Sequence, residues 1–475
     1  MAVVVPYRGG AGGQRRRGAV FAGSPMSSPP PARLPAAENR QALRLFLVQA
    51  ALLGTWSSVG VPANAIVSGF ALDVLGLSRE NAGLIGACVY LAAVWQFLSF
   101  LVTNRLADRK RFVVLAGVGE VVCLVLMLAV PGLFRRGSGL ACGVFLGLLF
   151  LSGTCLHVAQ PLLGSWLSAV VPARIRGRYL GSRQVLMTGL ATVGTWGGTW
   201  VVDRWHTWGG FAVAILACGL AGLAGVAVLA RTPMPPVSQQ THFRLRDFAG
   251  VLKLDDFRRY LVFVSMLFAA FSLACSYYAV FFIEEIGLSY TQIGWYVIGH
   301  NLLMILVLRP GGRLVDRIGA KPVLLGMLLI YAAFYLSFPF FTAARYWLVL
   351  LAWTLVGIAD GLYWVAGIST LYQALPRGPE RAGYLAVAQG VIMVGMGLGP
   401  LLVRAYLPLA RHLEFVVWGV RLERFRLLYV VCGLLMLATL GAAARLRNTV
   451  SVPFRHALAA VLRDRLFRLL PLSWR

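Results

Sequence analysis

Long apolar runs alternate with short polar segments along most of the chain. Runs of about 20 or more mostly apolar residues, the length that a helix needs to cross a bilayer, lie near 43–70, 82–103, 112–132, 139–170, 180–202 and 209–230. Six more lie near 259–283, 291–311, 323–341, 346–375, 383–407 and 427–445. The runs are continuous rather than alternating, which favours helices over a β-barrel. The pattern predicts an all-α membrane protein with twelve transmembrane helices.

Three segments fall outside these runs. Residues 1–42 are rich in glycine, proline and arginine without hydrophobic periodicity, which predicts a disordered tail, with an arginine-rich organelle transit peptide as the alternative. Residues 231–258 open with prolines and then place apolar residues at helical spacing among cations, which predicts a linker with an interfacial helix. The same basic amphipathic pattern predicts a second lipid-bound segment over 446–475.

The two sets of six runs are related by internal repeats. Residues 75–83 match residues 286–294 at a constant offset of 211, and Tyr179 and Leu180 match Tyr384 and Leu385 at an offset of 205. Because six spans return the chain to the side where it began, the repeat predicts two parallel six-helix bundles, residues 43–230 and 259–445. Ser289, followed three residues later by Gln292, predicts a capped helix start, and Ser78 predicts another.

One polar segment between two apolar runs carries three cations and a carboxylate in what we expect to be a short turn. Its marked positions are Gly312, Asp316, Arg317, Gly319 and Lys321. An earlier copy keeps Asp108 and Arg109 but has Asn104 where the first glycine would be. This sequence motif resembles the loop signature of the major facilitator superfamily of membrane transporters. The resemblance implies two pseudo-symmetric bundles that open alternately around a central cavity lined by spans one, four, seven and ten, with this segment as a cytoplasmic gate.

Composition and charge agree with a membrane protein. Of 475 residues, 59% are hydrophobic and 13% are charged, and the net charge is +27. With both termini in the cytoplasm, inner segments hold 33 Lys and Arg residues and outer loops hold nine, as the positive-inside rule requires. The charge therefore indicates a membrane orientation rather than a nucleic-acid partner. We expect a monomer, with both termini cytoplasmic, in the inner membrane of a bacterium.

The sequence lacks the marks of an enzyme. It contains no P-loop, no zinc-ligand spacing and no credible catalytic triad, and its seven cysteines lie inside the predicted spans without CxxC spacing. We expect no cofactor and no structural metal.

Few ionisable residues lie deep in the predicted spans. A carboxylate at bilayer depth costs about 2.5–3.5 kcal/mol, and among the acidic residues only Glu120 and Asp360 stand well inside a run. Asp360 and His157 are candidates for substrate or proton contact because the resemblance places both beside the cavity. The alternatives are an interhelical bond for Asp360 and a satisfied core histidine for His157. Glu120 is better explained by a structural partner.

Further polar residues are weaker candidates. Arg183 could neutralise Glu120 or a substrate anion, or face lipid headgroups. The remaining mid-span candidates for hydrogen bonds to a solute are His300, Asn301, Asn64 and Gln389.

These observations predict a secondary active transporter that moves a small organic solute by alternating access with proton coupling. One carboxylate and one or two histidines at depth favour such a solute over a highly charged anion. Two alternatives stay open: an uncoupled facilitator, and a membrane assembly or sensor protein that keeps the fold without transporting.

Overall fold

The computed structural model describes residues 34–60, 64–96, 108–172, 175–235, 254–375, 381–417 and 420–447. The predicted interfacial helix of the 231–258 linker, most of the 1–42 tail and nearly all of the 446–475 segment lie outside these ranges.

The first half of the chain is helical. Its first apolar run forms α1 (Ala36–Gly60), α2 (Ala65–Gly69) and a π-helical turn, Phe70–Val74. A 3₁₀ turn, Arg79–Asn81, leads into α3 (Gly83–Ala92). The other elements are α5 (Arg109–Leu126), a 3₁₀ turn (Met127–Ala129), α6 (Val130–Leu133), α7 (Gly139–Val170), α8 (Arg176–Arg204) and α9 (Trp208–Arg231).

The second half repeats this arrangement. It comprises α11 (Asp255–Cys275), α12 (Tyr278–Val280), a π-helical turn (Phe281–Glu285), α13 (Tyr290–Ile318), α14 (Ala320–Leu336) and two 3₁₀ turns (Phe338–Phe340, Ala343–Arg345). There follow α15 (Tyr346–Leu362), a π-helical turn (Tyr363–Gly367), α16 (Ile368–Ala374), α17 (Arg381–Leu409), a 3₁₀ turn (Ala410–His412), strands β1 (Glu414–Val417) and β2 (Val420–Glu423), and α18 (Arg424–Ala444).

The helices agree with the predicted spans in number and order as far as they are described. Eleven helical segments within the described residues are long and apolar enough to cross a membrane. The remaining expected span, 82–103, is described only as far as residue 96 and begins with α3. One boundary is wrong: α1 starts at Ala36, inside the segment 1–42 that was expected to be disordered, because good helix formers such as Ala36, Ala37 and Glu38 extend the helix beyond its apolar part.

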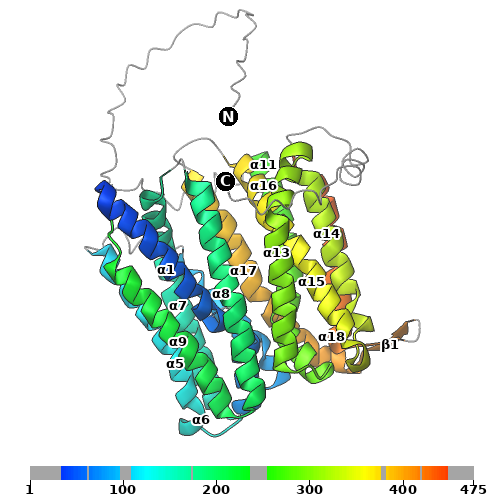
Figure 1. Cartoon of the computed structure of the whole chain (residues 1–475). Helices are drawn as coiled ribbons and strands as arrows, with labels where there is room; N and C mark the ends of the chain where they lie inside the picture. The colour runs from blue at the N-terminus through cyan, green and yellow to red at the C-terminus, as the bar shows by residue number, and fades with distance from the viewer. Residues whose placement is uncertain are drawn as a thin grey trace, which may run out of the picture.

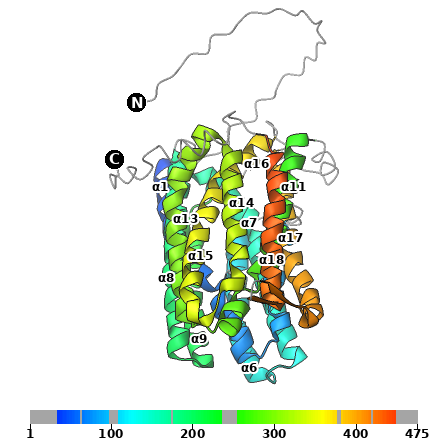
Figure 2. The same cartoon turned by 90° about the vertical axis from the view of Figure 1, so that its right-hand side faces the viewer.

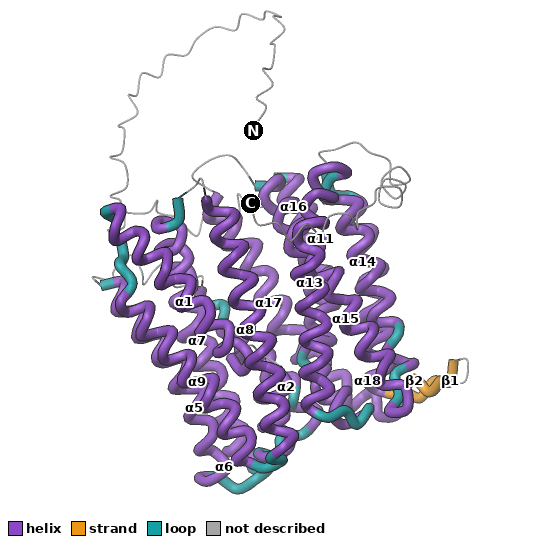
Figure 3. The backbone as a smooth tube through the Cα atoms, viewed as in Figure 1, coloured by secondary structure: helices purple, strands orange, loops and turns teal. Residues whose placement is uncertain are grey.

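The helices gather into two halves whose ends define two faces of the molecule. Figure 1 shows α1, α5, α8 and α9 on one side and α13, α14, α15 and α18 on the other. We call the end where α1 and α11 begin and α9 and α18 end the terminal end, and the opposite end the loop end. The halves meet where α8 packs against α13 and α3 packs against α17. The β1–β2 hairpin, an antiparallel pair with Phe415 opposite Leu422, extends from the loop end (Figures 2 and 3).

The internal sequence repeat is also seen in the backbone conformation of the two halves. The π-helical turns Phe70–Val74 and Phe281–Glu285 lie 211 residues apart, as do Gly76 (φ 73°) and Gly287 (φ 76°), which follow them. The left-handed backbone at both turns favours glycine. The capping prediction is confirmed at Ser289, whose hydroxyl and Gln292 form a capping box. Ser78 makes no such bond and precedes a 3₁₀ turn instead.

The gate motif does not form the expected turn. Helix α13 continues through Gly312, Asp316 and Arg317 to Ile318, and α14 starts at Ala320. The chain reverses at Gly319 alone, where φ is 88° and ψ is 164°, a conformation open only to glycine at low cost. The prediction was wrong because the motif's own residues are compatible with a helix until the glycine ends it. Asp316 and Arg317 therefore stand on the last turn of α13, and Lys321 stands on the first turn of α14.

Candidate functional site

Asp360 lies at the junction of three helices of the second half. On α15, its Oδ1 accepts a hydrogen bond from the hydroxyl of Tyr331 on α14. Its Oδ2 lies 3.0 Å from Nε2 of His300 on α13. The Asp360 side chain keeps 28% of its surface exposed and His300 keeps 15%, so the pair is only partly enclosed. Sequence reasoning named Asp360 and His300 separately, and the fold brings them together.

The surroundings of His300 determine where protons can reside. Its Nδ1 lies 3.3 Å from the carbonyl oxygen of Trp353, which can only accept, so Nδ1 carries a proton. Nε2 then carries a second proton if the imidazole is charged, or faces a protonated Asp360 if the imidazole is neutral. In either form the pair holds one proton between Nε2 and Oδ2. Loss of that proton would leave two acceptors facing each other.

Close backbone packing keeps these helices together at this depth. A Cβ added at Gly357 on α15 would collide with the backbone of His300 on α13. A Cβ added at Gly299 would collide with the side chain of Thr354. Small residues allow such close approach between membrane helices. The position of the His300 ring relative to Asp360 is thus set by rigid packing rather than by a loop.

The other polar residues predicted as candidates lie apart from Asp360 and from one another. His157 lies on α7 near the carbonyl of Val89, and the structure describes no contact between it and Asp360. The Asn301 amide donates to Thr192 of α8 at 2.7 Å, across the junction of the halves. Asn64 caps α2 by accepting from the backbone of Val67 at 2.9 Å. Gln389 is exposed on α17.

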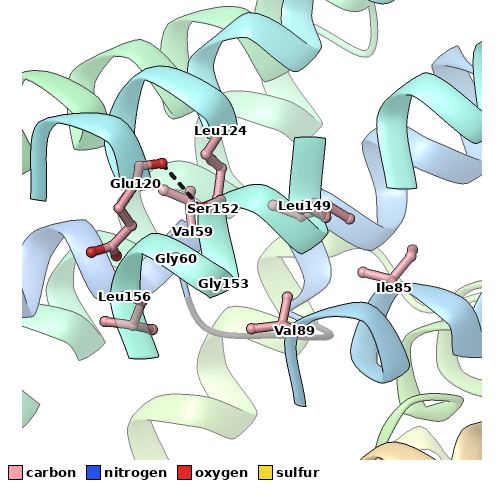
Figure 4. Close-up of a pocket in the computed structure, with 11 residues that line it drawn as sticks. Val59, Gly60, Ile85, Val89, Glu120, Leu124, Leu149, Ser152, Gly153 and Leu156 are labelled. Atoms are coloured by element: carbon pink, nitrogen blue, oxygen red, sulfur yellow. Dashed lines mark hydrogen bonds between the residues drawn. The ribbon is translucent and has the colours of Figure 1, made fainter. Parts of the chain in front are cut away.

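Glu120 has the structural partner that the sequence favoured. The indole of Trp56 on α1 donates to its Oε1 at 2.8 Å, and the hydroxyl of Ser152 on α7 donates to its backbone oxygen at 3.0 Å. A small pocket opens beside Glu120, lined by residues of α1, α2, α3, α5 and α7 that are mostly apolar (Figure 4). Since every lining residue belongs to the first half, this pocket is not the expected cavity between the halves.

Arg183 does not neutralise Glu120, contrary to one of the sequence-based alternatives. From α8, its Nη2 donates to Oε1 of Gln49 on α1 at 3.2 Å. Gln49 and Trp56 are seven residues apart on α1, so both contacts lie along one face of that helix, about two turns apart. The tertiary fold gives each charge a neutral partner on the same helix instead of pairing the two.

Several of the polar bonds that the structure describes between the halves lie at the loop end, where sequence reasoning had proposed no site. Both carboxylate oxygens of Asp203, at the end of α8, accept from the first backbone N–H groups of α13, from Tyr290 at 3.0 Å and from Thr291 at 2.6 Å. The Tyr290 hydroxyl donates to Asp73 at 2.6 Å. Arg79 pairs with Glu284. We call these five side chains the loop-end latch: Asp73, Arg79, Asp203, Glu284 and Tyr290.

A weak sequence signal for this latch existed. The capped start at Ser289 marked a helix N-terminus, whose free N–H groups and positive dipole attract carboxylates. The three carboxylates of the latch, Asp73, Asp203 and Glu284, stand near the ends of apolar runs in the sequence, at about 70, 202 and 283. No local pattern shows, however, that residue 203 meets residues 290 and 291.

The gate motif residues are engaged differently at the terminal end. Asp108 caps α5 by accepting from the backbone of Arg111 at 2.9 Å. Lys321 donates to the carbonyl of Ala444 within the second half. Asp316 is exposed, and among the described residues it has no hydrogen bond or ion pair. Each hydrogen bond described for Asp108 and Lys321 joins residues of the same half of the molecule.

The fold is that of an integral multi-pass membrane protein. It superposes on the nucleoside transporter NupG with a TM-score of 0.63 at 13% identity, covering 86% of this chain and 99% of that one. The inward-open xylose transporter XylE from E. coli gives 0.63 at 16% identity, covering 89% and 99%. A bacterial homologue of the human lysosomal transporter Spinster, inward-facing and unoccupied, gives 0.59 at 16% identity, covering 91% and 99%.

Sequence comparison gives the family. The model of the Major Facilitator Superfamily matches twice, over residues 45–283 and 262–460, and the chain belongs to this family. A probable nitrate/nitrite transporter of Mycobacterium tuberculosis, NarK2, is 25% identical over 352 residues, which are 72% of this chain and 82% of that protein. An uncharacterised MFS-type transporter of Methanocaldococcus jannaschii is 21% identical over 354 residues, 72% and 86% of the two chains. These relatives are transporters, not enzymes.

Proposed function

We propose that this protein is a secondary active transporter that moves a small organic solute by alternating access, coupled to protons through Asp360. The observation that carries the proposal is the set of polar bonds that join the two halves at the loop end. The described polar bonds between them run from the Thr192–Asn301 contact to the loop-end latch, while Asp316 at the terminal end is exposed. Bonds that join the halves at this face suit a protein whose halves can close together at the loop end during alternating access.

The Asp360 and His300 pair supplies a physical link between protons and helix packing. With its shared proton, the pair bonds α15 to α13. Without it, two acceptors 3.0 Å apart repel, and the contact between these helices weakens. A protein that releases this proton on one side and takes it up on the other can couple proton movement to rocking of the halves.

Solute-driven pH change tests this proposal. Proteoliposomes with a trapped pH indicator are given nitrate, xylose or uridine, which represent the solute classes named for NarK2, XylE and NupG. Proton coupling predicts that a transported solute changes the internal pH as it moves. Solute entry without a pH change would favour the uncoupled facilitator. Entry of none of them, also across a wider metabolite panel, would favour the non-transporting alternative.

We further propose that the terminal end faces the cytoplasm of a bacterial cell. The excess of Lys and Arg in the segments at this end, 33 against nine, supports the orientation. A cysteine introduced as Ser238→Cys, in the linker at this end, should react with a membrane-permeant maleimide and not with an impermeant one added outside intact cells. A cysteine introduced as Arg135→Cys, at an exposed position of the loop end, is the matched control and should react with both. The reverse pattern would refute the orientation.

The gate motif gives a second prediction. When the terminal end closes, exposed Asp316 can form charge-assisted bonds with helices of the other half, worth roughly 1.5–3 kcal/mol. Asp316→Asn should therefore raise the ratio of molecules open at the terminal end to molecules closed there by about tenfold or more. Asp108→Asn should have a smaller effect, because asparagine also caps α5. Distances between spin labels across the terminal end measure the effects of the two variants. Equal effects would contradict the role of Asp316 in closing this end.

A further inference from the structure

Arg183 is a cation held inside the first half without an opposite charge. Its side chain is only partly exposed, and its Nε is buried with no hydrogen-bond partner in the part of the chain that the structure describes. The hydrogen bond from Nη2 to Gln49 is the one that the structure describes for this guanidinium, and no carboxylate pairs with it among the described residues. A buried donor without an acceptor, and a buried charge without a counter-charge, both destabilise a fold. Packing within the protein therefore does not account for this arginine.

Arg183 lies in the part of α8 nearer the terminal end. Helix α8 packs against α1 in its own half and against α13 in the other half. The described contacts between α8 and α13 run from Thr192 with Asn301, through Trp196 with Trp295, to Asp203 with Tyr290. Arg183 precedes Thr192 by nine residues, about 13 Å along a helix and on the side of the terminal end. Nine residues are also about two and a half turns, so Arg183 lies nearer the terminal end than these contacts and on the opposite side of α8, which faces α1.

The neighbours of Arg183 hold its guanidinium in place and leave donors free. Gln49 is buried, and the hydroxyl of Tyr179, one turn earlier on α8, donates to the carbonyl of Leu43 on α1 at 2.7 Å. These contacts join α8 to α1 around the arginine. Planar guanidinium donors of this kind match the two oxygens of a planar oxyanion.

We propose that Arg183, oriented by Gln49, binds the anionic group of a small monoanionic solute, a carboxylate or another planar oxyanion. This proposal deepens the proposed transport function by naming the charge class of the solute. A single arginine suits a monoanion, whereas a highly charged solute would need several cations. The bound oxyanion would accept from the Nε–H, which has no partner among the described residues.

Thermal unfolding of the purified protein in detergent tests this site. Sodium nitrate and sodium acetate are compared with sodium chloride at equal ionic strength and with acetamide, the neutral analogue of acetate. A ligand that binds only the folded state should raise Tm, here by about 2–4 °C at saturation. We expect this rise for the wild type, its loss in Arg183→Gln, and its retention in Arg204→Gln, which removes an exposed arginine from the other end of the same helix.

Two results would overturn the proposal: no difference between the oxyanions and chloride in the wild type, or an unchanged rise in Arg183→Gln. If Arg183→Gln does not fold, Arg183→Lys is measured. Lysine keeps the charge but not the planar fork, so a weaker rise supports the site and an unchanged rise refutes it. Because binding is measured without a membrane or a gradient, its failure leaves the transport proposal standing. Failure of solute uptake likewise leaves this binding result intact.

Discussion

Asp360→Asn should abolish accumulation of solute against its gradient while leaving exchange down a gradient intact. Asparagine has nearly the volume of aspartate and can still accept from Tyr331 and donate to neutral His300, so the junction of α13, α14 and α15 survives. It cannot bind or release a proton. With one proton per solute, a pH gradient of one unit supports about tenfold accumulation, and without coupling the ratio returns to about one.

Uptake into proteoliposomes with and without an imposed pH gradient measures this effect. Glu120→Gln is the matched control, because Glu120 is the other carboxylate deep in a span but bonds to Trp56 within the first half. It should keep gradient-driven accumulation. An Asp360→Asn protein that still concentrates solute with unchanged pH dependence would show that Asp360 only joins helices, the interhelical alternative that its contacts with His300 and Tyr331 also satisfy.

Asp203→Ala should move the protein toward the state that is closed at the terminal end. The mutation removes two charge-assisted hydrogen bonds to the start of α13, from the backbone N–H groups of Tyr290 and Thr291. Bonds of this type contribute roughly 1.5–3 kcal/mol each. They exist only while the loop end is closed, so their loss changes the equilibrium between the two states by about tenfold or more.

Spin labels at Arg231→Cys and Arg445→Cys, at the ends of α9 and α18, report this change in a variant without native cysteines. The mean distance between the labels should shorten when Asp203 is replaced. Asp255→Ala is the control, since its exposed ion pair with Arg258 lies within one half and surface pairs contribute about 0–1 kcal/mol. An unchanged distance distribution in Asp203→Ala would contradict the role of the latch.

The spans, their number and the duplication were predictable because they depend on local properties. A helix in hydrocarbon must satisfy its backbone within itself and present apolar side chains all around, so a run of residues such as 209–230 is read as a span without knowledge of its neighbours. The same holds for the capping box of Ser289 and Gln292, which involves residues three positions apart. The motif around Asp316 was recognisable for the same reason, although the point at which α13 ends was not.

The site depended on the tertiary structure, because its contacts join residues distant in sequence. Asp360 was notable on insertion cost alone, but its partners lie 60 residues away in His300 and 29 residues away in Tyr331, and only the packing of α13, α14 and α15 brings them together. Asp203 resembles any carboxylate at a span end until the halves dock and place the start of α13 against it. Hydrophobicity constrains each helix separately, whereas the angle and depth at which helices pack decide which polar groups meet.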